Sequence, residues 1–170
     1  RGIAVELGAA GATVYCTGRS VRGNPSDMNR PETIDETAEL VTAAGGHGIA
    51  VRTDHTNEAE VRALFERVSA EQNGQLDVLV NDVWGGDGLT EWGVPFWELD
   101  VNKGLRMLER ALFTHILTSR YGVPLMVARG RGLVIEIGDG DTLSYRGNLL
   151  YDLVKTSVIR LAFGMAEELR

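Results

Sequence analysis

A tyrosine and a lysine four positions apart, Tyr151 and Lys155, are the residues whose types and spacing first suggest chemistry. On an α-helix this spacing places both side chains on one face. A tyrosine near its ordinary pKa of about 10 is a poor acid or base at neutral pH, but a nearby cation favours the phenolate and lowers that pKa. The pair therefore indicates a general acid–base with its activating cation, although such pairs also occur by chance on helix surfaces.

A second candidate is the loop "TGRSVRG" at 17–23, which follows an apolar run and contains no acidic residue. In a doubly wound nucleotide-binding sheet, an acid in this loop accepts a hydrogen bond from the ribose of NAD, whereas an arginine accommodates the 2′-phosphate of NADP. Arg19 and Arg22, with Ser20 as a further donor, favour NADP(H). The alternative is that both arginines are simply solvated.

Two further polar residues, Asp54 and Asn81, stand at the ends of apolar runs. In an open parallel sheet, ligands bind at the carboxyl ends of the strands, so both residues are expected near a cofactor crevice. Taken singly, each is also typical of a turn or a helix cap.

The elements that must position these residues follow an alternating pattern. Short runs rich in β-branched residues alternate with segments of helical period, which predicts an α/β fold with a parallel sheet flanked by helices. The expected strands are residues 12–18, 48–54, 76–82 and 132–138. The expected helices are the first ten residues, a segment opened by Pro31 and ending at Gly45, then 57–68, about 103–128, and a last one from about Leu150.

Size and charge limit the possible functions. A chain of 170 residues with 44% hydrophobic side chains suits one domain spanning 1–170. The net charge is −7 and there is no run of Lys or Arg, so we expect no nucleic-acid partner. No apolar run approaches the roughly 20 residues needed to cross a bilayer, so we expect no membrane partner.

The cysteine and histidine residues indicate the cellular compartment and the metal content that we expect. The single cysteine, Cys16, cannot form an internal disulfide, which indicates a reducing compartment and hence the cytoplasm. His47, His55 and His115 lack the spacing of a metal site, so we expect no metal.

Several motifs occur together in a characteristic order: "RGIAVELGAAGATVYCTGRS", "RTDHTNEAEV", "LDVLVND", "GLVIEIG" and "YDLVK". This set resembles the short-chain dehydrogenase/reductase family over essentially the whole chain. The resemblance implies a Rossmann-like doubly wound parallel sheet and an NADP(H)-dependent oxidoreductase acting on a small carbonyl or alcohol. It also implies a homo-oligomer built on the long helix before the fourth strand and on the last helix.

The resemblance also implies a role for each candidate residue. Tyr151 exchanges a proton with the substrate oxygen, while Lys155 lowers the tyrosine pKa and holds the nicotinamide ribose. Asp54 meets the adenine, Asn81 lines the cofactor crevice, and Arg19 selects NADP(H).

The chain departs from the family pattern at three places. The family's serine, thirteen residues before the tyrosine, is replaced by Gly138, and its helical asparagine falls near Ala111. The family's Asn-Asn-Ala-Gly is replaced by "NDVWGG". The loop "GDGDTLS" offers substitutes for the serine, namely Asp139, Thr142 and Ser144.

These departures suggest an alternative function, that of a catalytically impaired family member that binds a cofactor or acts as a regulatory protein. A methyltransferase-like fold is a third possibility, but it leaves Arg19 and the Tyr151/Lys155 pair unexplained.

The position of the motifs also suggests a fragment. The family's first strand and Gly-rich turn would precede Arg1, and its last strands would follow Arg170. Since the family's strand order is 3-2-1-4-5-6-7, the missing first strand would lie at the centre of the sheet. We therefore expect an incomplete sheet and an inactive chain when isolated, but an active full-length protein.

All three tryptophans lie in the segment 84–97, directly after a strand expected at the crevice. They could form an aromatic wall for an apolar carbonyl substrate. Alternatively, they pack over helix ends or contact another subunit.

Overall fold

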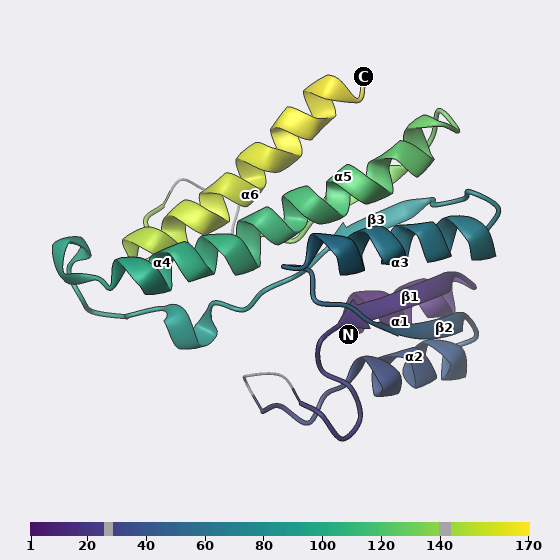
Figure 1. Cartoon of the computed structure of the whole chain (residues 1–170), viewed down its shortest axis with the longest axis horizontal. Coiled ribbons are helices and arrows are strands. Elements are labelled where there is room, and N and C mark those ends of the chain that lie inside the picture. The colour runs from purple at the N-terminus through teal and green to yellow at the C-terminus, as the bar shows by residue number, and fades with distance from the viewer. Residues whose placement is uncertain (26–28, 140–143) are drawn as a thin grey trace. The chain divides into compact units, whose positions relative to one another are not determined.

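The computed structural model describes residues 1–25, 29–139 and 144–170. These residues divide into two compact units, Arg1–Asn57 and Glu58–Arg170, each of which is described by itself (Figure 1).

The first unit pairs two parallel strands and covers them with helices. It contains α1 (Gly2–Ala9), β1 (Thr13–Gly18), α2 (Ile34–Ala43) and β2 (His47–Arg52). The register places Thr13 opposite His47 and Gly18 opposite Arg52. Its core consists of Cys16, Ala38 and Val41 with partly buried apolar neighbours. Helix α2 lies directly on the sheet because position 48 is glycine; a Cβ at Gly48 would come 2.0 Å from the Ala38 carbonyl oxygen.

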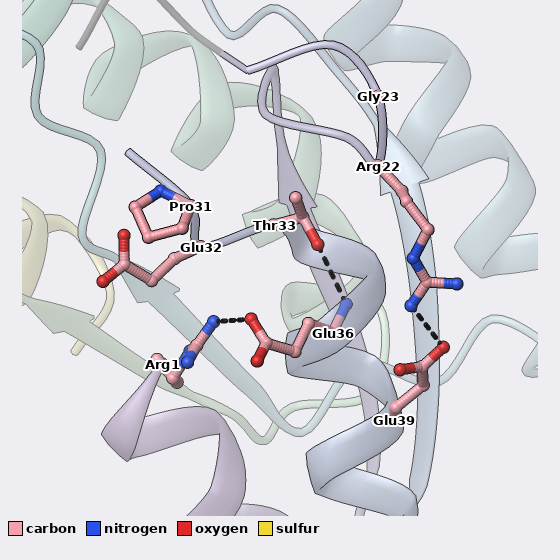
Figure 2. A pocket seen from close by; sticks show the side chains of 8 residues that line it. All are labelled: Arg1, Arg22, Gly23, Pro31, Glu32, Thr33, Glu36 and Glu39. Carbon is pink, nitrogen blue, oxygen red and sulfur yellow. Dashed lines mark hydrogen bonds and ion pairs between the residues drawn. The ribbon is translucent and has the colours of Figure 1, made fainter. Parts of the chain in front are cut away.

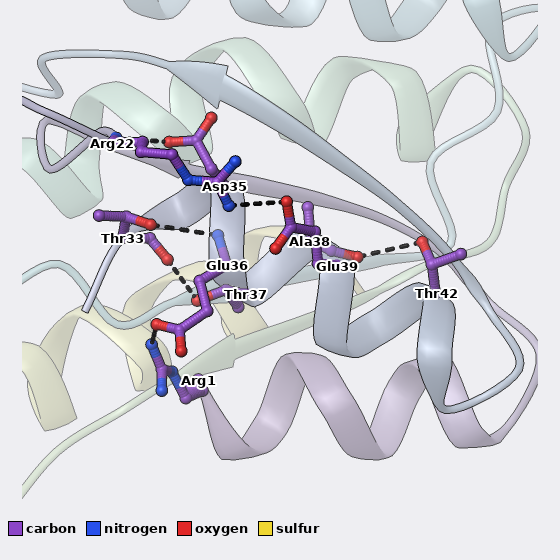
Figure 3. A network of polar contacts seen from close by, with 9 residues as sticks. All are labelled: Arg1, Arg22, Thr33, Asp35, Glu36, Thr37, Ala38, Glu39 and Thr42. Atoms are coloured by element: carbon purple, nitrogen blue, oxygen red, sulfur yellow. Dashed lines mark hydrogen bonds and ion pairs between the residues drawn. The ribbon is translucent and has the colours of Figure 1, made fainter. Parts of the chain in front are cut away.

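Helix α2 begins later than the sequence predicted. We expected Pro31 to open it, but the first helical residue is Ile34. The reason is a cap: Thr33 has an extended backbone, and its hydroxyl accepts a hydrogen bond of 3.1 Å from the Glu36 N–H (Figure 3). Pro31 therefore lies in the loop before the cap.

The second unit is larger and carries most of the helices. Its regular elements are α3 (Glu58–Glu71), β3 (Val78–Asn81), α4 (Val101–Leu108), η3 (Glu109–Phe113), α5 (Thr114–Val127), β4 (Leu133–Glu136) and α6 (Leu149–Glu168). Strands β3 and β4 pair in parallel, from Val78 opposite Leu133 to Asn81 opposite Glu136. Helix α5 packs on both strands, and α6 contacts α4 and β4 (Figure 1).

The long helix expected at 103–128 is present but is not uniform. It begins at Val101, where the Asp100 carboxylate caps it, and it passes through the π-helical turn η3 before continuing as α5. A π-helical turn inserts an extra residue into the helical repeat, and such turns are frequent at functional sites. Ala111, the position where we expected the family's asparagine, lies buried inside this turn.

The four expected strands are confirmed, each shorter than predicted at one or both ends. Among the described residues they form two separate two-stranded sheets, β1–β2 and β3–β4. Each pair is parallel and is covered by helices, as in an α/β fold, and the sheet is incomplete in this chain. The fold class and the incompleteness of the sheet are thus as predicted.

Candidate active site

Asn148 fixes the start of the helix that carries the tyrosine and the lysine. Its side-chain oxygen accepts hydrogen bonds of 3.0 Å from the Leu150 and Tyr151 N–H groups. Its amide nitrogen donates to the Glu91 carbonyl at 2.9 Å, and the residue is buried. Asn148 thereby ties the first turn of α6 to the segment 84–97. Sequence reasoning missed this residue, although an asparagine just before an apolar helical run is a typical cap.

Tyr151 lies between aromatic rings and a carboxylate. Its hydroxyl donates a hydrogen bond of 2.5 Å to Asp139 Oδ2. Its ring centroid lies 5.5 Å from that of Trp84, edge to face, and 5.2 Å from that of Trp92. Two of the three tryptophans thus flank the candidate acid–base, while Trp97 packs on Phe96 and is largely exposed.

Lys155 lies on the same face of α6, as the four-residue spacing predicted. Its Nζ is 4.1 Å from the centroid of the Trp84 ring and 5.6 Å from that of Tyr151. Burial lowers the pKa of Lys155, and the negative charges of nearby Asp139, Asp82 and Asp87 oppose that shift. Within the described residues its ammonium makes no hydrogen bond or ion pair. Lys155 therefore presents a partly buried set of donors beside Tyr151, with no acceptor from residues 1–25, 29–139 or 144–170.

The surroundings of Tyr151 raise its pKa to about 12. Burial contributes most, followed by the hydrogen bond to Asp139 and the negative charge of that carboxylate. This direction is opposite to the lowering by Lys155 that the sequence predicted, because the hydroxyl is held by an anion while the lysine lies against the rings.

The missing serine and its possible substitutes can now be located. A Cβ built on Gly138 meets nothing closer than Ile159 Cγ1 at 3.9 Å, so a serine side chain has room there. Of the three polar substitutes, Asp139 contacts Tyr151, Ser144 is exposed, and Thr142 lies outside the described residues.

Asn81 belongs to a buried polar network between β3, β4 and α5. Its Nδ2 donates to Ser119 Oγ at 2.9 Å and to Glu136 Oε1 at 2.6 Å. Its Oδ1 is buried and has no hydrogen-bond partner within the described residues. The side chain is fully buried, so the structure gives Asn81 a role in joining the two strands to α5.

The network continues through a buried histidine that sequence reasoning considered only as a metal ligand. His115 Nδ1 lies 2.6 Å from Glu136 Oε2, and its Nε2 lies 2.9 Å from the Val83 carbonyl oxygen. Since a carbonyl only accepts, Nε2 carries a hydrogen, and one further proton is shared between Nδ1 and Glu136. The available sequence signal was a glutamate inside an apolar strand, which requires a buried partner.

The first unit holds the residues expected to choose the cofactor. Arg22 is engaged: its guanidinium contacts Glu39 at 2.7 Å and its backbone N–H donates to Asp35 at 2.8 Å (Figure 3). A neighbouring pocket has a volume of about 540 Å³. On its wall Arg1 pairs with Glu36, and Glu32 also lines the pocket (Figure 2). Its lining sets three glutamates against two arginines, which disfavours a phosphate group.

Asp54 follows β2 and closes a turn. Its Oδ1 accepts hydrogen bonds from the Thr56 N–H at 2.9 Å and the Thr56 hydroxyl at 2.7 Å. Burial raises the pKa of Asp54, but these hydrogen bonds and the charges of Arg19 and Arg52 outweigh it, so the net shift is downward. The first unit thus brings Asp54 within the electrostatic reach of Arg19, and the second unit brings Tyr151 and Lys155 together.

Two broader properties concern the described residues. No helix among them is both long and apolar enough to cross a membrane. They also contain no group of three His, Cys, Asp or Glu side chains arranged to hold a metal ion.

Parallel strand pairs covered by helices, with a tyrosine and a lysine on one helix face, define a Rossmann-like α/β protein. The profile of the family described as short chain dehydrogenase matches residues 1–170. The chain therefore belongs to the short-chain dehydrogenase family, which confirms the resemblance drawn from its motifs.

Comparison with individual proteins agrees with this assignment. The chain is 38% identical to the mouse (Mus musculus) protein "Dehydrogenase/reductase SDR family member 1", over 100% of its own length and 52% of that protein. It spans about half the length of the mouse relative and of the human (Homo sapiens) protein of the same name. A metagenomic short-chain oxidoreductase crystallised with NADP has a TM-score of 0.82 at 26% identity, covering 99% of this chain and 70% of that one. An NADH-dependent reductase complexed with NAD shares the fold, with a TM-score of 0.76 at 20% identity, covering 97% of this chain and 65% of that one.

Proposed function

We propose that the full-length protein is an NADP(H)-dependent oxidoreductase that transfers a hydride between nicotinamide and a small carbonyl or alcohol. Tyr151 serves as the general acid–base and Lys155 as the cation beside it. The observation that carries this proposal is the partly buried Lys155 ammonium, which has no acceptor of its own within the described residues and lies 4.1 Å from the Trp84 ring centroid and 5.6 Å from that of Tyr151. The three donors of an ammonium group remain available to a ligand where no protein acceptor binds them.

The donors present fit a nicotinamide nucleotide. Lys155 would donate to ribose hydroxyls, as the family resemblance implies. The cofactor, when bound, supplies the hydride. The chain's own contribution is to hold a proton on the Tyr151 hydroxyl at the substrate oxygen and to flank the Tyr151 ring with those of Trp84 and Trp92. These rings form the aromatic wall that we propose for an apolar substrate.

The preference for NADP(H) over NAD(H) is assigned to Arg19. Arg22, the other arginine of that loop, pairs with Glu39, whereas the charge of Arg19 acts on Asp54, the residue that we propose meets the adenine. We therefore assign the 2′-phosphate to Arg19. The NADP bound to the metagenomic relative supports this choice. Asp54 would contact the adenine. Asn81 would hold together the strands whose ends line the cofactor crevice.

Exposed apolar side chains support a homo-oligomer. On α4 and α6 they include Val101, Leu105, Leu153, Ile159 and Phe163. These are the helices for which the family resemblance implied subunit contacts. We also propose that the protein acts in the cytoplasm, on the grounds of its single cysteine.

A second candidate function is a cofactor-binding member with impaired catalysis. It is favoured by Gly138 in place of serine and by the pKa of about 12 for Tyr151, which opposes phenolate formation. The two candidates differ in turnover but not in cofactor binding.

The decisive experiment is a fluorescence titration with NADPH, and with NADH as a control, of both the full-length protein and the isolated 170-residue chain. A panel of carbonyl substrates is then assayed with the full-length protein. Tight NADPH binding with turnover supports the oxidoreductase, and NADPH binding without turnover on any substrate supports the impaired member. If the folded full-length protein binds neither nucleotide, both candidates are wrong.

A further inference from the structure

The hydroxyl of Tyr151 has an ionisable hydrogen-bond acceptor, Asp139, next to the position where the family pattern places a serine. Asp139 follows Gly138 directly, and its Oδ2 lies 2.5 Å from the Tyr151 oxygen. Position 138 itself supplies no side chain, and a Cβ there would meet nothing closer than 3.9 Å. The group that contacts the hydroxyl is therefore an ionisable carboxylate instead of a neutral alcohol.

We propose that Asp139 is the proton acceptor and donor behind Tyr151, so that the proton passes between the substrate oxygen and Asp139 through the tyrosine hydroxyl. This inference rests on the proposed oxidoreductase function and extends it. It assigns Asp139 and Tyr151 as a carboxylate–phenol pair. In oxidation, Asp139 holds the proton after the substrate has reacted, and solvent then receives it.

The backbone at position 139 is held in place by a second set of contacts. Arg146 Nε donates to the Asp139 carbonyl oxygen at 2.7 Å. Arg146 is fixed in turn by Asp152, which accepts from its Nη1 at 3.0 Å and from its backbone N–H at 3.2 Å. Because Asp152 belongs to α6, next to Tyr151, the same helix that presents the hydroxyl also anchors the residue that receives its proton.

The proton and electron balance of the step is complete. In alcohol oxidation, the substrate O–H bond breaks as its proton moves to the Tyr151 oxygen, and the tyrosine proton moves to the Asp139 carboxylate. The substrate C–H bond breaks in the same step, its hydride reduces the oxidised nicotinamide, and the carbonyl double bond forms. Asp139 is exposed and then returns its proton to water. Carbonyl reduction is the reverse.

This relay removes the difficulty posed by the raised pKa of Tyr151. A pKa of about 12 makes a free phenolate scarce at neutral pH. When the tyrosine passes on one proton while it receives another, no phenolate has to accumulate. The same hydrogen bond that raises the pKa therefore provides the path for the proton.

Other charged groups lie around this pair. Arg146 and Asp87 act on Tyr151, while Asp139, Asp82, Asp87 and Arg146 act on neighbouring Lys155. Among the described carboxylates, Asp139 is the one that hydrogen-bonds the Tyr151 hydroxyl, whereas Asp87 accepts from the Trp84 indole at 2.8 Å. Asp87 thus offers a matched charge that does not touch the reacting proton.

The sign of the pH dependence follows from the roles. Oxidation needs Asp139 ionised, so its rate falls as pH falls and the carboxylate takes up a proton before the substrate reacts. Reduction needs Asp139 protonated, so its rate rises over the same range. An enzyme governed by Tyr151 alone would show neither limb in the acidic range.

The test uses the full-length protein with Asp139→Asn, Asp139→Glu and the charge control Asp87→Asn. We expect Asp139→Asn to lower kcat for alcohol oxidation about 100-fold with little change in KM, and to abolish the acid limb. Asp139→Glu should retain the limb at a reduced rate, and Asp87→Asn should also retain it. A wild-type kcat and an unchanged acid limb in Asp139→Asn would overturn the proposal. If Asp139→Asn does not fold, loss of the limb in a folded Asp139→Glu would overturn it instead.

A second readout is independent of turnover. A ring-fluorinated tyrosine at position 151 titrates at lower pH than tyrosine and can be followed by fluorine NMR while the protein stays folded. Asp139→Asn should lower its titration midpoint by about one pH unit, and Asp87→Asn by clearly less. If the wild type transfers no hydride to any substrate, the proposed function fails, and this titration then decides the pair alone: a lowered midpoint supports it and an unchanged one overturns it.

Discussion

The two units differ in how they treat their polar side chains. In the first unit the charged groups around α2 are paired, as in the contacts of Arg22 with Glu39 and of Arg1 with Glu36 (Figure 3). In the second unit, Lys155 has no acceptor and Asn81 Oδ1 has no donor within the described residues. Exposed pairs contribute little to stability, whereas unsatisfied buried groups are costly. The comparison indicates that the exposed pairs of the first unit add little stability, whereas Asn81 Oδ1, in the unit where we propose chemistry, lowers it.

The largest expected effect tests whether the second unit is catalytic. Tyr151→Phe removes the hydroxyl but keeps the ring that packs on Trp84 and Trp92, so we expect kcat of the full-length protein to fall about 1000-fold with NADPH affinity retained. Steady-state kinetics and cofactor fluorescence measure the two quantities. A residual rate within a few-fold of the wild type would show that Tyr151 is not the acid–base and that the second unit does not differ from the first in this way.

A second prediction concerns the stability of the buried network. His115→Ala leaves the Glu136 carboxyl without its ring partner in a site where both side chains are at most 3% exposed. We expect a loss of about 3 kcal/mol in the free energy of unfolding, measured with denaturant.

The matched control for this prediction is Arg67→Ala, which removes an exposed pair with Glu71 one helical turn away. It should cost less than about 0.5 kcal/mol. Similar losses in the free energy of unfolding for the two variants would show that the buried pair stabilises the protein no more than an exposed pair does.

A third prediction separates the two arginines of the first unit. Arg19→Ala should weaken NADPH binding about 30-fold and leave NADH binding nearly unchanged, because a charge-assisted contact to the 2′-phosphate is lost. Arg22→Ala should have a much smaller effect, since Arg22 is already paired with Glu39. Equal losses for both nucleotides on Arg19→Ala would contradict the assignment.

A fourth prediction uses the lowered pKa of Asp54. A carboxyl whose pKa is lower in the folded state than in the unfolded state adds stability above its unfolded pKa, and that stability is lost as pH falls through its folded pKa. Asp54→Asn should therefore cost less than about 1 kcal/mol at neutral pH, and the cost should shrink as pH falls below about 4 and vanish below the lowered pKa of the folded state. Unfolding curves of both proteins between pH 2 and pH 7 check this expectation.

The smallest effect is expected at Gly138. A serine fits there without displacing Ile159, so Gly138→Ser should leave the melting temperature nearly unchanged. Since Asp139 already contacts the Tyr151 hydroxyl, we expect less than about a threefold change in kcat. A large gain in turnover would instead favour the catalytically impaired member as the natural state.

The sequence predicted the short-range features well. The four strands, the order of the helices and the common face of Tyr151 and Lys155 follow from local periodicity, which depends on neighbouring residues. The error at Pro31 was also local, because Thr33 is the better cap and its spacing to Glu36 was readable. The π-helical turn around Ala111 was not predictable from periodicity, since it inserts a single residue into an otherwise helical pattern.

The sequence is enough to identify the family, the alternation of strands and helices, and the residue types available for catalysis. The tertiary structure determines which of these residues contact one another. Asp139 lies 12 positions from Tyr151, His115 lies 21 from Glu136, and Asn81 lies 55 from Glu136. Such pairs form because β3, β4, α5 and α6 pack together. The direction of the Tyr151 pKa shift therefore depends on packing, which the spacing of Tyr151 and Lys155 alone does not determine.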